Sequence, residues 1–123
     1  MLPVEWMGAA LRDLREFPGE VQRVLGYALY IAQRGEHAQS AKRLKGSLSG
    51  LVEIVDDFDG DTYRAVYTLK LKGAVYALHV FQKKSTRGIS APRRHVDVIT
   101  DRLARARAHH AVHYTAHAAL ETP

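Results

Sequence analysis

The hydrophobic pattern changes period once along the chain, and this change limits the possible folds more than any other feature. From residue 9 to residue 35, apolar residues recur at helical spacing in two stretches separated by Pro18. From Leu51 to Phe81 the pattern is that of strands, rich in β-branched and aromatic residues and interrupted by short polar turns. Helices followed by strands predict an α+β domain rather than an alternating α/β one.

The first half of the chain predicts an N-terminal helical hairpin. Residues 9–17 form its first helix, and Pro18 ends that helix and suits the first turn of the second. Gly35 suits the C-terminal cap of the second helix. Val4 to Met7 reads as an edge strand, and residues 36–50 are polar enough to be expected as a loop.

The second half predicts a small antiparallel sheet with three strands, at 51–55, 63–71 and 74–81. An acidic turn from Asp56 to Asp61 joins the first two, and the third is apolar enough to be a central strand. We expect the helices to cover one face of the sheet and to leave the other open for a ligand.

A C-terminal helix is expected to begin at Pro92, with most of its arginines outside. Its inner face follows helical spacing: Val96, Ile99, Leu103 and Ala106.

The length of 123 residues suits a single domain, which we place at 1–108, followed by a His- and Ala-rich tail at 109–123 that is expected to fray. There is no cysteine, which excludes disulfides and cysteine-based zinc sites. The first residues do not resemble a signal peptide, and no apolar run approaches the length of a membrane span. We therefore expect a cytoplasmic protein with no membrane partner.

The positive charge of the chain is concentrated in one segment. The net charge is +5, and residues 1–81 are balanced, whereas residues 82–107 hold eight Lys and Arg against two Asp. Such a cluster suits a phosphate backbone, which favours RNA or another polyanion as partner. A solvated basic helix that only aids solubility is the alternative.

Three basic features are expected to converge on the sheet. Arg64 stands inside a strand, Lys83 and Lys84 directly follow the most apolar strand, and Lys42 and Lys45 lie in the loop before the first strand. A phosphate among them would meet a rigid guanidinium and movable ammonium groups. Two alternatives stay open. Arg64 can instead pair with Glu53 or Asp61, and the two lysines can be an ordinary charged strand exit.

Aromatic residues and histidines add further candidates. Tyr63, Tyr67 and Tyr76 lie in strands and can stack a base or pack in the core, although alternation puts the first two opposite Arg64. His79, in the apolar strand, is an acid–base candidate with a pKa near neutrality or a core histidine.

The histidines of the tail are spaced for one helix face: His109, His113 and His117. Only Glu121 could join them as a carboxylate ligand, so we expect neither a metal site nor a cofactor.

Several stretches together resemble the phage-derived, HigB-like branch of the RelE/ParE toxin superfamily, over about residues 5–107. They are Ala10 to Phe17 with Pro18, Gly26-Tyr27-Ala28-Leu29, Leu44-Lys45-Gly46, Tyr63-Arg64-Ala65-Val66-Tyr67 and Val75-Tyr76-Ala77-Leu78-His79-Val80-Phe81-Gln82-Lys83-Lys84-Ser85.

The resemblance implies a small antiparallel sheet flanked by helices, and the toxin of a type II toxin–antitoxin pair. Members of this kind cleave mRNA in the ribosomal A site and are silenced by a cognate antitoxin, here expected to be a helix-turn-helix protein. By position, Arg64 matches the strand arginine of the family, Lys83 and Lys84 its basic pair, and Lys45 the lysine of its Leu-Lys-Gly loop. The Glu-Leu-Arg of the family is replaced by Glu53-Ile54-Val55, which removes one expected basic group.

The implied reaction is metal-independent cleavage of RNA, in which a ribose 2′-hydroxyl attacks the adjacent phosphate. Arg64 would stabilise the phosphorane, Lys83 or Lys84 would protonate the leaving oxygen or clamp the phosphate, and Lys45 or His79 would act as base. Further basic residues would bind RNA: Lys42, Arg43, Arg87, Arg93 and Arg94. Two other functions stay open, a ParE-like gyrase inhibitor without nuclease activity and a degenerate phage relic that only binds an antitoxin.

Overall fold

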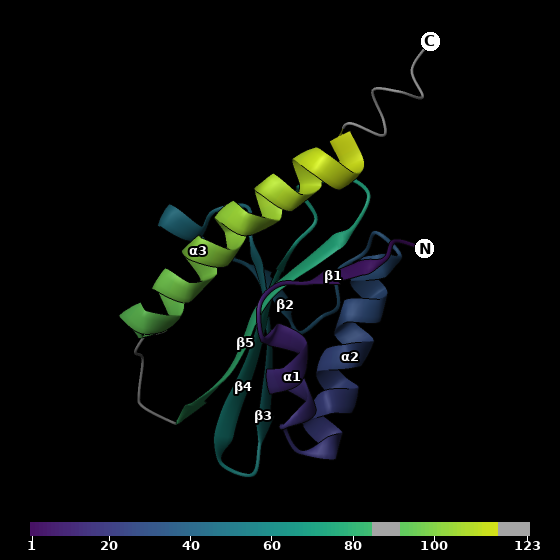
Figure 1. Cartoon of the computed structure of the whole chain (residues 1–123). Coiled ribbons are helices and arrows are strands. Elements are labelled where there is room, and N and C mark those ends of the chain that lie inside the picture. The colour runs from purple at the N-terminus through teal and green to yellow at the C-terminus, as the bar shows by residue number, and fades with distance from the viewer. Residues whose placement is uncertain (85–91, 116–123) are drawn as a thin grey trace.

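A computed structural model describes residues 1–84 and 92–115 of the chain. Its centre is a five-stranded sheet in the order β1-β5-β4-β3-β2. Helices flank the sheet on both sides (Figure 1). The strands are β1 (Val4–Trp6), β2 (Ala41–Arg43), β3 (Val52–Phe58), β4 (Asp61–Thr68) and β5 (Val75–Lys84). The helices are α1 (Ala10–Arg15), α2 (Gly19–Gln33) and α3 (Arg93–His110).

The predicted antiparallel meander is formed by β3, β4 and β5, and β5 lies inside the sheet between β1 and β4. The turn between β3 and β4 is shorter than expected, because only Asp59 and Gly60 leave the strands. Both have positive φ, 53° and 85°, the conformation of a tight type I′ hairpin. Asp56 and Asp57 are therefore strand residues, and the prediction of an acidic turn over 56–61 was too long.

The two edges of the sheet come from segments where the sequence pattern is weak. β1 is the expected edge strand, but it runs parallel to β5, with Val4 opposite Val75, so the sheet is mixed. β2 lies within residues 36–50, where a loop was expected, and pairs antiparallel with β3. A 3₁₀ turn at Gly46–Leu48 follows it.

Each face of the sheet is covered by a different part of the chain. The helical hairpin α1–α2 packs on one face, where its core includes Leu25, Ile54 and Tyr67. α3 packs on the opposite face, where Ile99 and Ala106 contact a second core that includes Tyr76. The prediction of an open second face was wrong for the part that α3 covers (Figure 1), because the apolar side of this helix also needs a surface to bury.

The chain stays ordered beyond the residue where fraying was expected. α3 continues past Ala108 to His110, and a turn of π-helix follows at Ala111–Thr115. Within this turn the Tyr114 hydroxyl donates a 2.7 Å hydrogen bond to the Glu5 carboxylate. The C-terminal turn is thereby joined to β1.

Candidate functional site

Strand register gathers several of the expected residues on the face that α3 partly covers. Directly opposed residues of antiparallel strands point to the same side of a sheet. Phe81 of β5 is opposite Arg64 of β4, and Lys83 and His79 occupy the rows on either side of it. Lys42 of β2 lies opposite Glu53, in the row that ends at His79.

Arg64 is neutralised by an acidic neighbour. Its Nη1 donates to Oε1 of Glu53 at 2.6 Å, and the two side chains are 18% and 5% exposed. The Nε of Arg64 is buried without a hydrogen-bond partner among the described residues. The alternative that Arg64 pairs with Glu53 is therefore confirmed, and the guanidinium is not a free cation in the resting protein.

Lys83, unlike Arg64, has no acidic partner among the described residues. Only 9% of its surface is exposed, yet no hydrogen bond or ion pair joins its ammonium group to another described residue. Its ammonium nitrogen is not among the buried atoms without a partner, so the alkyl part of the side chain is buried and the charge reaches the surface. The side chain of Lys84 and the whole of Arg87 lie outside the described part of the chain.

The basic groups of the 36–50 segment do not join Lys83. Lys45 precedes the start of β3 at Val52, whereas Lys83 lies level with Asp57 in the register. Five residues of strand separate these two levels by about 17 Å. Lys45 and Arg43 are exposed at that other end of the sheet, so the expected convergence of all three basic features was wrong.

A bulge in β5 places two consecutive residues on the α3 face. Val66 is opposite His79, but Tyr67 is opposite Ala77, so Leu78 is the additional residue. As a result Leu78 packs in the core beneath α3 and the adjacent His79 also contacts that helix.

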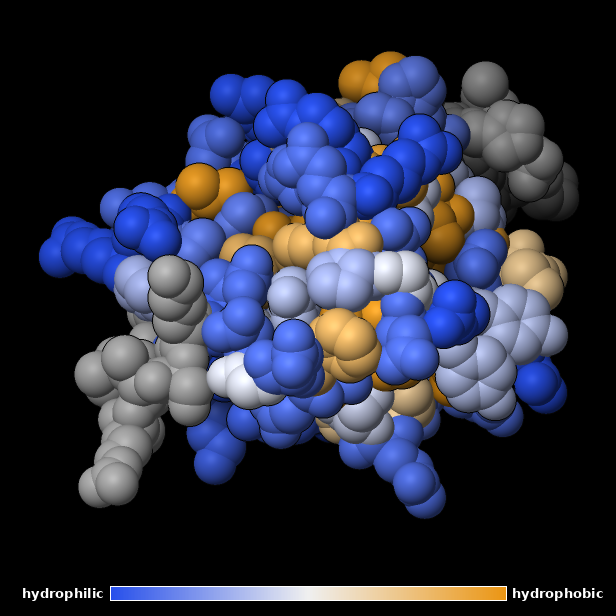
Figure 2. All heavy atoms as spheres, turned by 90° about the horizontal axis from the view of Figure 1, so that it is seen from below, coloured by the Kyte–Doolittle hydropathy of each residue, from blue (hydrophilic) through white to orange (hydrophobic). Residues whose placement is uncertain are grey.

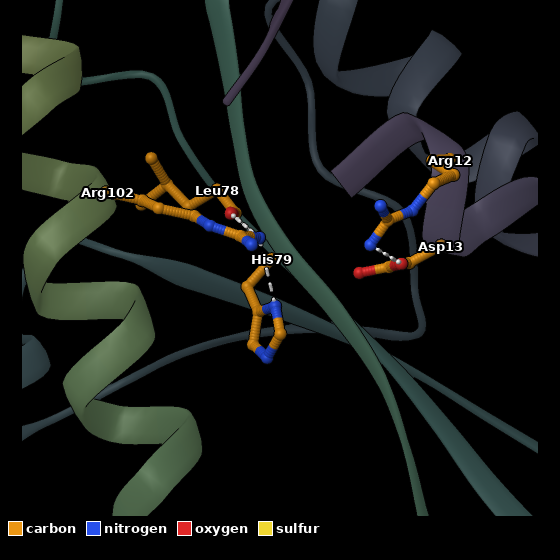
Figure 3. A network of polar contacts seen from close by, with 5 residues as sticks. All are labelled: Arg12, Asp13, Leu78, His79 and Arg102. Carbon is orange, nitrogen blue, oxygen red and sulfur yellow. Dashed lines mark hydrogen bonds and ion pairs between the residues drawn. The ribbon is translucent and has the colours of Figure 1, made fainter. Parts of the chain in front are cut away.

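His79 is held between two residues of α3. Arg102 Nη1 donates to the Leu78 carbonyl oxygen at 3.0 Å and to His79 Nδ1 at 3.2 Å (Figure 3). His79 Nε2 lies 2.9 Å from His95 Nδ1. Burial, with Arg102 and His95 as further causes, lowers the pKa of His79 to about 4. The expectation of a pKa near neutrality was wrong, because the ring is buried beside a cation.

His95 and Arg102 were not among the residues singled out in the sequence. His95 is half-buried in the first turn of α3, and its ring stacks on Phe81 with centroids 4.1 Å apart. Burial, followed by the nearby Arg94 charge, lowers the pKa of His95. The available signal was helical spacing, since His95, Ile99 and Arg102 fall on one side of α3. Arg102 is thus an exception to the expectation that the arginines of this helix lie outside.

The remaining candidates have structural partners or lie outside the described residues. Tyr63, Tyr67 and Tyr76 are all buried, so none is available to stack a base. Tyr76 has its hydroxyl 2.8 Å from Nδ1 of His109. Within the described residues, no group of three His, Asp or Glu side chains could hold a metal ion. His117 is outside them.

The end of the molecule that carries the β3–β4 hairpin and the last residues of β5 is largely hydrophilic. Figure 2 shows this end, where apolar side chains form only small patches between polar ones. Arg93 and Arg94, in the first turn of α3, are exposed. Across the residues that the structure describes, none of the helices has the length and apolar character needed to cross a membrane.

A family model described as "Phage derived protein Gp49-like (DUF891)" matches residues 12–104, which is most of the chain. The chain belongs to the Gp49-like family. No curated protein matches this Gp49-like sequence significantly.

Solved structures similar to the Gp49-like chain are RelE toxins. The isolated RelE toxin of E. coli has a TM-score of 0.57 and 18% identity, and the match covers 71% of this chain and 89% of that one. A double arginine mutant of E. coli RelE in the free state has a TM-score of 0.56 and 18% identity, and covers 85% and 96%. The RelBE2 toxin–antitoxin complex of Mycobacterium tuberculosis has a TM-score of 0.49 and 23% identity, and the match covers 67% of this chain and 98% of that one. The RelE-like α+β fold, expected from the sequence, is confirmed.

Proposed function

We propose that this Gp49-like chain is the toxin of a type II toxin–antitoxin pair and acts in the cytoplasm as a ribosome-dependent mRNA endoribonuclease. Its family and its RelE-like fold support the toxin assignment. The proposed cleavage needs no metal ion, and the proposed inhibitor is a helix-turn-helix antitoxin.

The observation that carries the nuclease proposal is the state of Lys83. Lys83 is held close to the surface of the sheet, with only 9% of its surface exposed, and its ammonium group has no anionic partner among the described residues, so it is available to bind an anion. An RNA phosphate supplies that anion. The described surface at this end of the molecule is largely hydrophilic (Figure 2), which suits a nucleic acid better than an apolar partner.

In the proposed reaction a ribose 2′-hydroxyl gives its proton to water and attacks the adjacent phosphorus, and the bond to the 5′-oxygen of the next nucleotide breaks. The products are a cyclic phosphate and a free 5′-hydroxyl. Lys83 and Lys84 contact the phosphate, and one of them protonates the leaving oxygen. Arg64, whose charge Glu53 balances, contributes hydrogen-bond donors rather than net charge. The more distant cations bind the RNA backbone: Lys42, Arg43, Lys45, Arg87, Arg93 and Arg94.

Neither of the two expected bases is placed to take the proton of the 2′-hydroxyl. Both ring nitrogens of His79 are engaged, and Lys45 lies at the other end of β3.

The test compares Lys83→Met with Lys72→Met, which makes the same change at an exposed lysine in the β4–β5 turn. After brief induction without antitoxin, primer extension on a message should show cuts within codons for the wild type and for Lys72→Met. The Lys83→Met variant should lose about 10²–10³ in cleavage rate. It should remain folded, because methionine fills a similar volume and the Lys83 ammonium group has no partner to lose among the described residues. Equal cleavage by both variants would refute the assignment of Lys83.

A gyrase inhibitor of the ParE kind is the second candidate, because Val55 stands beside Arg64 where the family often has a basic residue. In that case induction would leave messages intact and would trigger a DNA-damage response. Growth that continues unchanged would instead indicate a relic that binds only an antitoxin.

A further inference from the structure

A hydrogen-bonded series of three side chains runs from α3 to β5 and back to α3. It begins at Arg102, passes through His79 and ends at His95, with nitrogen–nitrogen distances of 3.2 Å and 2.9 Å. Arg102 is fixed at its start by a second bond to the Leu78 carbonyl oxygen. Of the four ring nitrogens of the two histidines, only Nε2 of His95 has no hydrogen bond to another described residue.

The direction in which these hydrogen bonds are donated follows from the chemistry of Arg102. A guanidinium group donates hydrogen bonds and never accepts them, so Nδ1 of His79 must be the acceptor. A neutral His79 therefore carries its proton on Nε2 and donates it to Nδ1 of His95. It follows that a neutral His95 carries its own proton on Nε2, the nitrogen that is not in contact with His79.

The same arrangement keeps both rings neutral. A proton added to His95 would go to Nδ1 and would face the Nε2–H of His79, so that two donors would oppose each other. Burial acts in the same direction and, together with Arg94, lowers the pKa of His95. His95 is thus a fixed N–H donor and not a base, since the lone pair of its accepting nitrogen is already used.

His95 also lies beside the site of the proposed cleavage. Its ring stacks on Phe81 at 4.1 Å. Phe81 is directly opposite Arg64, and Lys83 is the next residue of β5 on the same face. A neutral donor in this place can bind an anion without adding another charge to the Arg64–Lys83 region.

We propose that His95 contacts the scissile phosphate, its Nε2–H donating to a phosphate oxygen that Lys83 also binds. His79 and Arg102 are positioning residues that hold the proton of His95 on that outer nitrogen. This role rests on the proposed function for the nature of the ligand, an RNA phosphodiester.

Two substitutions separate the two nitrogens of His95. The amide nitrogen of glutamine reaches the place of Nε2, whereas that of asparagine reaches only the place of Nδ1. Both substitutions remove the ring stacking on Phe81, so each controls for the other. The probe is a short 2′-O-methyl RNA, which offers phosphates but no 2′-hydroxyl nucleophile. We expect His95→Gln to bind it within about threefold of the wild type and His95→Asn to bind about 10-fold or more weakly. Equal affinity of the two variants, or no binding of the probe by the wild type, would overturn the proposal.

Nitrogen-detected NMR at pH 7.5 tests the positioning residues directly. Both His79 and His95 should be neutral with the proton on Nε2, and the His95 signal should shift when the probe binds. In His79→Phe, His95 should show a mixture of both neutral forms while the protein stays folded. A charged His95, or a proton on its Nδ1 in the wild type, would contradict the chain of donors.

The outcomes also separate this role from the nuclease activity. Suppose that the wild type and the variants bind the probe with the expected relative affinities, but the wild type cuts no message on ribosomes. His95 would then remain a phosphate contact, and the nuclease proposal would be refuted. If the wild type cuts messages and His95→Asn binds the probe and cuts messages equally well, the phosphate contact of His95 would be refuted. The nuclease proposal would stand.

Discussion

The ion pair between Arg64 and Glu53 shows how a charged residue is tolerated inside a sheet. Arg64 was predicted to lie in a strand, and Glu53 was one of two partners considered for it. The register of β3 and β4 decides between them, because Glu53 lies two residues along β3 from Val55, which is directly opposite Arg64. Both side chains are largely buried, so each depends on the other to offset the loss of water.

We expect Glu53→Leu alone to lower the free energy of unfolding by about 3–5 kcal/mol, because it leaves the Arg64 charge unpaired. The double variant Glu53→Leu with Arg64→Leu should recover most of this loss. Urea unfolding of the wild type, both single variants and the double variant provides a double-mutant cycle that measures the coupling of Glu53 and Arg64. Additive losses would show that the pair is not coupled.

The buried His79 should make stability depend on pH. Its pKa is about 4 in the folded state, against about 6.5 when unfolded, so the unfolded chain binds more protons between these values. The free energy of unfolding should therefore be lost as pH falls from about 6.5 towards 4, by about 3 kcal/mol from this group.

Urea unfolding between pH 4 and pH 7 measures this loss. Carboxyl groups also contribute to the curve, so the decisive quantity is the difference from His79→Gln, which should lack this share of the slope. Identical slopes in the two proteins would mean that folding does not lower the pKa of His79.

The secondary structure was largely predictable where the pattern is strong. The two helices of the hairpin, the three strands of the meander and the helix after Pro92 all follow from spacing and turn residues. The bulge in β5 was not predictable, since strict alternation would put Leu78 and His79 on opposite faces. For this reason the sequence located His79 but not its contacts with Arg102 and His95.

The loop between β1 and α1 limits where α3 can lie. Gly8 has φ of +54°, and a Cβ placed there would be 2.7 Å from Nε of Arg102. Gly8→Ala should therefore lower stability by about 1–3 kcal/mol and displace the Arg102 side chain. Thermal unfolding measures the first effect, and NMR of His79 the second.

Gly26→Ala is the matched control for this change. Gly26 lies within α2, where a Cβ meets nothing within 4 Å. Alanine there should raise stability by up to about 1 kcal/mol. If both alanine variants gave the same change, the contact between Gly8 and Arg102 would not matter.

Across the whole molecule, the largest difference from expectation is the position of α3. Its amphipathic pattern predicts that one side is buried but does not say which face of the sheet receives it. Packing on the face opposite α1 and α2 encloses Tyr76 and brings Arg102 inward. The basic segment is therefore divided, with Arg93 and Arg94 exposed and Arg102 committed to the interior.

The C-terminal turn should contribute to global stability. Tyr114 bonds Glu5 and lies close to Gly73, so it links the C-terminal turn to β1 and to the turn before β5. We expect Tyr114→Ala to lower the free energy of unfolding by about 2 kcal/mol or more. Val112→Ala, at a position that is 67% exposed, should change it by less than about 0.5 kcal/mol. Chemical unfolding of both variants provides the comparison.

The parallel pairing of β1 with β5 has a consequence for how the protein is made. Val4 is paired with Val75, so the first strand has no neighbour until most of the chain has left the ribosomal tunnel. Arg102, which organises the two histidines, emerges later still. A nascent chain of this kind cannot complete its sheet before β5 has emerged, and the proposed RNA-cleaving surface forms only after α3 has followed.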